Sequence, residues 1–147
     1  MKTIEKSILV LHSAQQMFDL VSAVDRYTEF LPWCASSRIV NLHDDGMTAE
    51  IGMAYGKLTQ AFTTRNTHIA GREIHLKLEK GPFSQLEGTW RFIPIGSEDD
   101  NACRTEFKIQ YATENSILGK LIAPFFDKIA TSLVDAFFNR ANELYNK

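Results

Sequence analysis

The chain has 147 residues, of which 44% are hydrophobic, and a formal net charge of -2. A chain of this length buries roughly 70% of the surface that its unfolded form exposes, so we expect a single domain spanning residues 1–147. The small net charge argues against strong electrostatic steering toward nucleic acid or acidic lipid.

The sequence shows neither a secretory signal nor a membrane span. The apolar run at residues 8–11 is too short for the hydrophobic region of a signal peptide. No segment approaches the roughly 20 apolar residues that cross a bilayer. These observations predict a cytoplasmic protein.

The two cysteines, Cys34 and Cys103, lie far apart in the sequence. Neither belongs to a CxxC motif or has a histidine at metal-ligand spacing. We therefore expect two reduced, partly buried thiols and no metal site.

The first elements are predicted to be a strand and two short helices. Residues 3–11 are rich in Ile, Leu and Val, and Ser13 is a favourable N-cap for a helix that follows. Apolar residues then recur at helical spacing. A second short helix from Asp25 is expected to end before Pro32, because the residue before a proline disfavours the helical conformation.

The period of the apolar residues then changes from 3.6 to 2, which is typical of strands with one face in water. Short turns containing Gly or Asp separate these segments, as expected for antiparallel neighbours. With the N-terminal strand, they make a sheet of seven strands. The later strands are predicted near residues 36–43, 47–55, 58–69, 73–79, 85–92 and 103–111.

From Ile117 the period becomes helical again and continues to Tyr145. Pro124 lies within this pattern. A proline lacks the N–H donor and clashes with the carbonyl four residues earlier, so we expect either a kink or a short first helix that restarts.

These elements predict an α+β fold, in which a curved seven-stranded antiparallel sheet surrounds a long C-terminal helix and two short helices follow the first strand. A sheet bent around one helix does not close tightly along its whole length, so we expect a pocket between them. The alternative is that the aromatic residues simply fill the core. The expected lining residues are Phe62, Leu76, Leu78, Trp90, Phe92, Phe107, Ile109, Phe125, Ile129 and Phe137.

Three segments carry a resemblance to a known family: "YTEFLPWC" at residues 27–34, "GPFSQLEGTWRF" at 81–92 and "AFFNRANELY" at 136–145. With the order of elements around them, the chain resembles the START-like, polyketide cyclase/dehydrase superfamily, which has the helix-grip fold. Within that superfamily it is most similar to the coenzyme Q-binding protein and ribosome association toxin family. The resemblance covers nearly the whole chain.

The resemblance implies non-enzymatic binding of a hydrophobic ligand, most of all ubiquinone or a related isoprenoid lipid, in support of respiratory quinone function. Each buried CH₂ of such a ligand contributes about 0.8 kcal/mol. The loop residues Phe30, Leu31 and Trp33, together with Phe83, are expected to form a lid over the cavity. Ordinary rim packing is the alternative for Trp33 and Phe83.

The toxin branch of the family implies a different function, which is to dock on the large ribosomal subunit and block subunit joining, as in a toxin–antitoxin pair. Contact with RNA requires clustered cations. The sequence leaves this function and quinone binding open, together with peripheral contact with the inner membrane, and it predicts no DNA partner. The candidate cations, which Glu73 and Glu79 interrupt, are Lys57, Arg65, Arg72, Lys77 and Lys80.

Catalytic chemistry is not predicted, although "cyclase" is part of the superfamily's name. The four histidines are scattered, and the sequence has no nucleophile elbow or phosphate-binding loop. Asp127 and Asp135 are expected on the surface of the long helix. We therefore expect a binding protein that requires no cofactor, with ubiquinone or an isoprenoid lipid as its ligand.

Overall fold

Seven strands form one antiparallel sheet in the order β1-β7-β6-β5-β4-β3-β2, so β1 and β2 are its two edges. The structure is a computed structural model that describes residues 1–146; Lys147, the last residue of the expected domain, lies outside the described part. The strands are β1 (Lys2–Val10), β2 (Cys34–His43), β3 (Gly46–Tyr55), β4 (Leu58–Ile69), β5 (Glu73–Lys80), β6 (Phe83–Pro94) and β7 (Cys103–Thr113).

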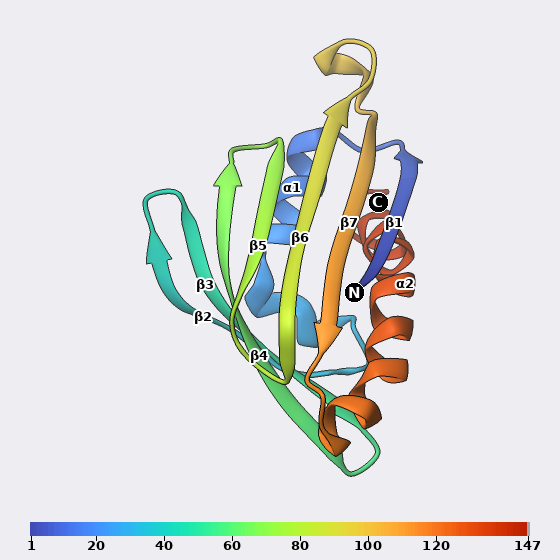
Figure 1. The fold of residues 1–147 in the computed structure, drawn as a ribbon. Helices are drawn as coiled ribbons and strands as arrows, with labels where there is room; N and C mark the ends of the chain where they lie inside the picture. Colours follow the sequence, from blue (N-terminus) through green and yellow to red (C-terminus); the bar gives the residue numbers. More distant parts are fainter. Residues whose placement is uncertain (147) are drawn as a thin grey trace.

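The helices cover one face of this sheet. The long helix α2 (Ile117–Tyr145) lies along β7 and β1, and α1 (Ala14–Ser22) packs against β5, β6 and β7 (Figure 1). The 3₁₀ helix η1 (Val24–Glu29) leads from α1 to β2, and a second one, η2 (Glu98–Asp100), lies between β6 and β7. The predicted α+β fold is confirmed.

Helix α1 begins where the sequence predicts, because Ser13 and Gln16 form a capping box. The Gln16 backbone N–H donates to Ser13 Oγ (3.0 Å), and the Ser13 N–H donates to Gln16 Oε1 (2.9 Å). The helix buries Met17, Leu20 and Val21 on the side that faces the sheet. As a result, the last turn of α1 lies over the interior of the fold.

Alternation along β7 is as predicted, since Phe107, Ile109 and Tyr111 are buried and their neighbours are less so. Strand β3 departs from this pattern, because Thr48 and Gly52 are also buried. The reason is its neighbour β2, whose Ser36 side chain lies directly over Gly52.

Helix α2 continues through Pro124 as one element, so the predicted alternative of a restarted helix is wrong. Ser116 caps its first turn, where the Gly119 N–H donates to Ser116 Oγ (3.0 Å). Leu121 is 58% exposed, so this apolar side chain lies outside the buried face of the helix. The residues that α2 buries are Gly119, Ile122, Phe126, Ile129, Ala130, Val134, Phe137 and Ala141.

Candidate functional site

An interior cavity lies between the sheet and α2, at the level of η1. Its volume is about 90 Å³. Apolar side chains from β3, β4, β5, β6, β7 and α2 form most of its wall. The lining residues are Val21, Ser22, Val24, Tyr27, Trp33, Ala49, Ile51, Phe62, Thr64, Asn66, His68, Ile74, Leu76, Leu86, Trp90, Phe107, Ile109, Phe126, Ile129, Ala130, Leu133 and Phe137.

The cavity is smaller than the pocket that the predicted lipid ligand requires. Ligand pockets for drug-sized molecules typically measure about 300–1,000 Å³. Here the aromatic rings pack mainly against one another, with Trp90 4.3 Å from Phe107 and 5.3 Å from Phe137 between ring centroids. The free space is smaller than the cavity of about 150 Å³ that holds a benzene ring, and a lipid-sized pocket is not present in this conformation.

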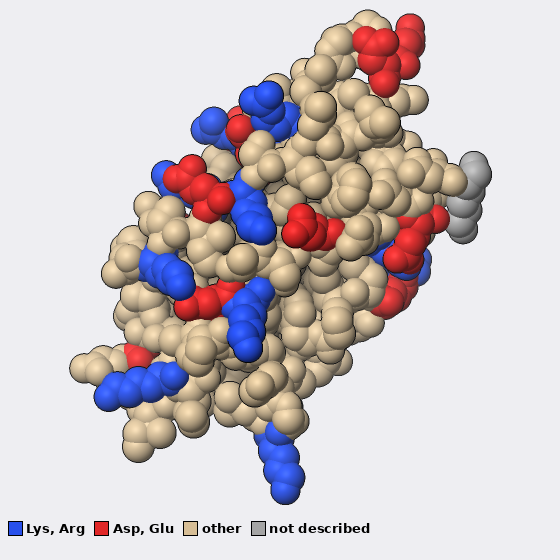
Figure 2. All heavy atoms as spheres, turned by 90° about the vertical axis from the view of Figure 1, so that its right-hand side faces the viewer, with Lys and Arg blue, Asp and Glu red and all other residues tan. Residues whose placement is uncertain are grey.

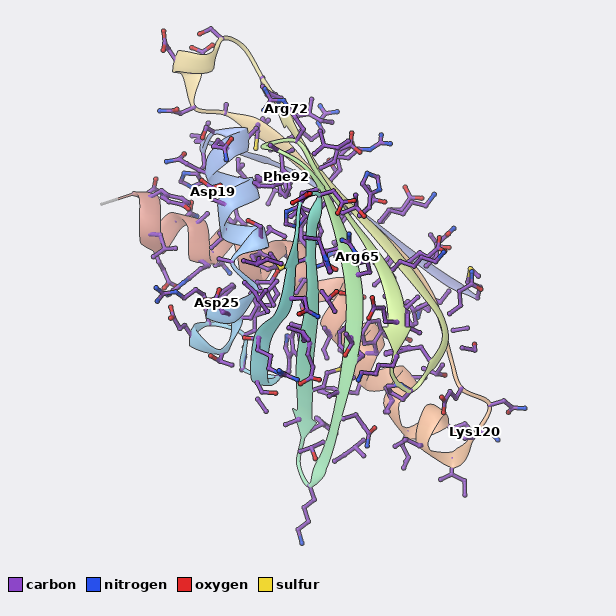
Figure 3. All side chains as sticks on the ribbon, turned by 90° about the vertical axis from the view of Figure 1, so that its left-hand side faces the viewer. Asp19, Asp25, Arg65, Arg72, Phe92 and Lys120 are labelled. Carbon is purple, nitrogen blue, oxygen red and sulfur yellow. The ribbon has the colours of Figure 1, made fainter. Side chains whose placement is uncertain are left out.

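Most of the predicted lining residues are brought together around this cavity: Phe62, Leu76, Trp90, Phe107, Ile109, Ile129 and Phe137. Phe92 instead lies beside α1, with its ring 6.0 Å from that of Phe18 (Figure 3). Phe125 packs against Tyr55 (4.8 Å), and Leu78 lies at the edge of the core. Their expected place in the lining is therefore wrong, and ligand binding by the others stays a prediction.

Among the predicted lid residues, Trp33 lines the cavity and the others do not. Leu31 is buried in a second hydrophobic cluster, and Phe30 packs between Phe137 (5.4 Å) and the Arg140 guanidinium (5.2 Å). Phe83 is only 4% exposed. The expectation that Phe83 points to an entrance is wrong, because its ring contacts those of Phe62, Phe126 and Tyr111 inside the core.

Replacing Phe83 by alanine is therefore expected to affect stability. The change Phe83→Ala should lower the free energy of unfolding by about 3–5 kcal/mol, the range for removing a buried aromatic ring. Urea denaturation followed by circular dichroism measures this change. A loss below about 1 kcal/mol would show that Phe83 is peripheral, as a lid residue would be.

The polar end of the cavity was not predicted. Phe62, Thr64, Asn66 and His68 alternate along β4 and all line the cavity, so they share one face of the strand. Thr64 Oγ1 donates a hydrogen bond to Asn66 Oδ1 (2.6 Å). Burial lowers the pKa of His68, which keeps its imidazole neutral. The period of two along β4 shows in the sequence that these residues share one face. Because the face is polar, however, the sequence suggests that it lies in water rather than in the interior.

The candidate RNA-binding cations are not gathered into one patch. Lys57 precedes β4 and Arg72 follows it, so they lie at opposite ends of this 12-residue strand. Arg65 and Lys77 are directly paired across β4 and β5, while Arg72 lies at the end of the sheet (Figure 3). Lys80 follows on β5.

Acidic residues also interrupt these cations. Arg65 forms an ion pair with Asp45, and Lys77 lies opposite Glu87 on β6. The face with α2 and β1 likewise shows cationic and anionic side chains interspersed (Figure 2). The charge distribution on these surfaces gives no large field of one sign.

Several titratable side chains have structural partners. His12 Nε2 lies 2.8 Å from Asn142 Oδ1, and His75 pairs with Glu73. Asp127 and Asp135 form ion pairs with Lys2 and Lys6, which confirms their predicted place on the surface. Burial raises the pKa of the thiols of Cys34 and Cys103, and both are free.

Within residues 1–146, no group of three His, Cys, Asp or Glu side chains is placed to hold a metal ion. In the same part of the chain, no helix is long and apolar enough to cross a membrane.

The curved sheet, the long helix and the cavity between them define a START-like protein of the helix-grip type. The chain belongs to the polyketide cyclase/dehydrase and lipid transport family, whose family model matches residues 10–138. This confirms the resemblance identified from the sequence.

Two relatives represent the two branches of the predicted family. A Pseudomonas aeruginosa protein named ribosome association toxin RatA is 39% identical, over 97% of this chain and 96% of its own. A Xenopus laevis protein named coenzyme Q-binding protein COQ10 homolog B, mitochondrial, is 26% identical, over 92% of this chain and 56% of its own length.

Two solved structures share the fold. The Zhui aromatase/cyclase from Streptomyces superimposes with a TM-score of 0.81 at 12% identity, covering 96% of this chain and 93% of its own. A START superfamily protein from Mycobacterium smegmatis gives a TM-score of 0.79 at 17% identity, covering 97% and 98%. At these identities the likeness concerns the fold alone.

Proposed function

We propose that the protein binds a small hydrophobic molecule without chemically changing it, and that the ligand is ubiquinone or a related isoprenoid lipid. The observation that carries this proposal is the interior cavity, which is apolar over most of its wall and polar at one end. The lipid-transport part of the family's description supports it, as does the relative named for coenzyme Q binding.

The size of the cavity sets how the ligand must enter. A space of about 90 Å³ is smaller than the cavity of about 150 Å³ that holds benzene, so a ligand requires the wall to move outward. Trp33 is the best candidate for this movement, because it is half-buried and follows the loop at residues 30–32. It also packs against both the main hydrophobic core and the second cluster that contains Leu31. Each CH₂ that the ligand buries contributes about 0.8 kcal/mol toward opening the wall.

A binding role is also favoured over catalysis by the polar groups of the lining. These are contributed by Ser22, Thr64, Asn66, His68 and Tyr27, with no carboxylate among them. General acid–base catalysis usually pairs a titratable group with a second one that orients it. Among residues 1–146, no carboxylate lines the cavity to serve as that partner for His68.

The test is organic extraction of the purified chain followed by mass spectrometry. We expect a quinone or another isoprenoid lipid in the extract, and we expect Trp33→Ala to lower its amount several-fold while the fold remains intact. Leu42→Ala removes an apolar side chain that is 76% exposed on β2 and serves as the control. If no lipid is extracted from the parent protein, quinone binding loses its support.

Association with the large ribosomal subunit is a second candidate, favoured by the similarity to proteins named ribosome association toxins. For this function the paired cations Arg65 and Lys77, with Lys80 beside them, are the best available contact for RNA phosphates. The nearby acidic residues make this surface weakly cationic, so we expect shape and apolar contacts to contribute.

Cosedimentation with purified ribosomal subunits tests the second candidate. The expected result is binding to large subunits that weakens with salt and with Lys77→Glu combined with Lys80→Glu. Lys57→Glu alters a cation at the other end of β4 and should have a smaller effect. A chain that stays in the supernatant at low salt would exclude this function.

We also propose peripheral contact with an anionic membrane through the end of the molecule where α2 begins. Ile117 is 80% exposed, Leu121 58% and Tyr55 62%. Lys57 and Lys120 are exposed at this end, and Figure 3 shows Lys120 near the start of α2. Apolar side chains with flanking cations are typical of interfacial binding.

Vesicle flotation tests membrane contact. Binding should require anionic lipid and should fall when Ile117→Ser is combined with Leu121→Ser, since these side chains would enter the acyl region. Equal flotation of parent and variant would exclude this surface, and binding to neutral vesicles alone would exclude the role of the lysines.

A further inference from the structure

We propose that Asn66 and His68 form a binding site for a carbonyl oxygen, so that the ligand of the cavity is an uncharged carbonyl compound such as a quinone or a ketone. This inference rests on the proposed function and names residues that hold the polar part of the ligand. The ligand's apolar part would then lie toward Trp90, Phe107 and Phe137.

The two side chains belong to a polar strip in an otherwise apolar wall. On β4, Asn66 and His68 are two residues apart and line the same cavity. Their partners across the sheet on β5 are apolar, since Asn66 is paired with Leu76 and His68 with Ile74. Polar side chains in such a wall have few hydrogen-bond partners within the protein.

The hydrogen bonds on this strip leave donors for a ligand. Asn66 is 4% exposed, and its Oδ1 accepts from Thr64 Oγ1, so its amide N–H₂ remains to donate elsewhere. Within residues 1–146, His68 Nε2 is buried and has no hydrogen-bond partner. A buried polar group without a hydrogen bond costs free energy, and a ligand that bonds to it would remove this cost.

The electrostatics of this end favour a neutral ligand over a fatty acid. Burial lowers the pKa of His68 and keeps its ring uncharged. The adjacent Arg65 pairs with Asp45 on the surface and donates to the Asn66 backbone carbonyl (2.7 Å), so its charge is already matched. A carboxylate moved into this end would lose its hydration without meeting a free cation, whereas a carbonyl loses much less.

Two small probes that differ by one group test this inference. Acetophenone has a carbonyl where α-methylstyrene has a C=CH₂ group, and both are single-ring compounds of nearly the same shape. Both tryptophans line the cavity, so fluorescence and NMR titrations report its occupancy. We expect the parent protein to bind acetophenone about three- to tenfold more tightly, which is within the range for one neutral hydrogen bond.

The variants Asn66→Leu and His68→Phe should each reduce that preference while leaving the affinity for α-methylstyrene unchanged or higher. Thr105→Val is the matched control, because Thr105 is 1% exposed and does not line the cavity. Retained binding of α-methylstyrene also demonstrates that a variant is folded.

The possible failures are distinguishable. Equal binding of both probes by the parent protein overturns the carbonyl site and leaves a hydrophobic cavity in place. A preference for acetophenone that persists in both variants assigns the carbonyl to other groups and also overturns the inference. If the parent binds neither probe and carries no lipid, the proposed function itself fails.

Discussion

Phe137→Asp is expected to unfold the protein or to lower its melting temperature by about 10–20 °C or more. Phe137 is 1% exposed, and its ring lies 5.3 Å from those of Trp90 and Tyr27. Removing a buried phenylalanine ring costs about 3–5 kcal/mol, and an unpaired carboxylate adds to this cost. Since a domain is stable by only about 5–15 kcal/mol, little stability would remain.

Calorimetry of Phe137→Asp measures this effect directly. Asn139→Asp provides the matched control, because it introduces the same negative charge at an exposed position two residues along α2. The control should melt within a degree or two of the parent. If Phe137→Asp also melted within a degree or two of the parent, Phe137 would not lie on the face of α2 that packs into the core.

The elements of this fold are largely predictable from the sequence, because most strands have one face in water. In β7 the buried residues Phe107, Ile109 and Tyr111 alternate with residues that are less buried, and this period is visible without the structure. Helix α1 is equally predictable, since Ser13 and Gln16 form a local capping signal.

The direction of particular side chains is less predictable, because it depends on contacts that are distant in sequence. The register between β6 and β7 shifts between Phe83 and Gln85, so Phe83 turns into the core rather than toward a rim. Helix α2 passes through Pro124 although the residue favours a break. In that case the packing of the helix against β1 and β7 outweighs the lost hydrogen bond.

The polar end of the cavity was missed for a related reason. Thr64, Asn66 and His68 make one face of β4 polar, and polarity alone suggests a face in water. Only the curvature of the sheet around α2 shows that this face is the inner one. Volume is likewise a tertiary property, so the sequence predicted a pocket but not its small size.

Filling the cavity should strongly reduce ligand binding without harming the fold. Ala130 is 1% exposed on α2 and lines the cavity. In Ala130→Leu, the three added carbon atoms enter the free space of about 90 Å³. We expect bound lipid per protein to fall about tenfold, and stability to stay constant or to rise by up to about 2 kcal/mol from the added apolar burial.

The same substitution elsewhere on the helix separates the cavity from the core. Ala141 is also on α2 and is 0% exposed, but it does not line the cavity. Ala141→Leu should therefore destabilise by about 1–3 kcal/mol through overpacking, and it should retain its lipid. Mass spectrometry and urea denaturation on both variants give the two readouts. Lipid that survives Ala130→Leu at the parent's level would place the binding site outside this cavity, because a filled cavity leaves no room for the ligand's ring.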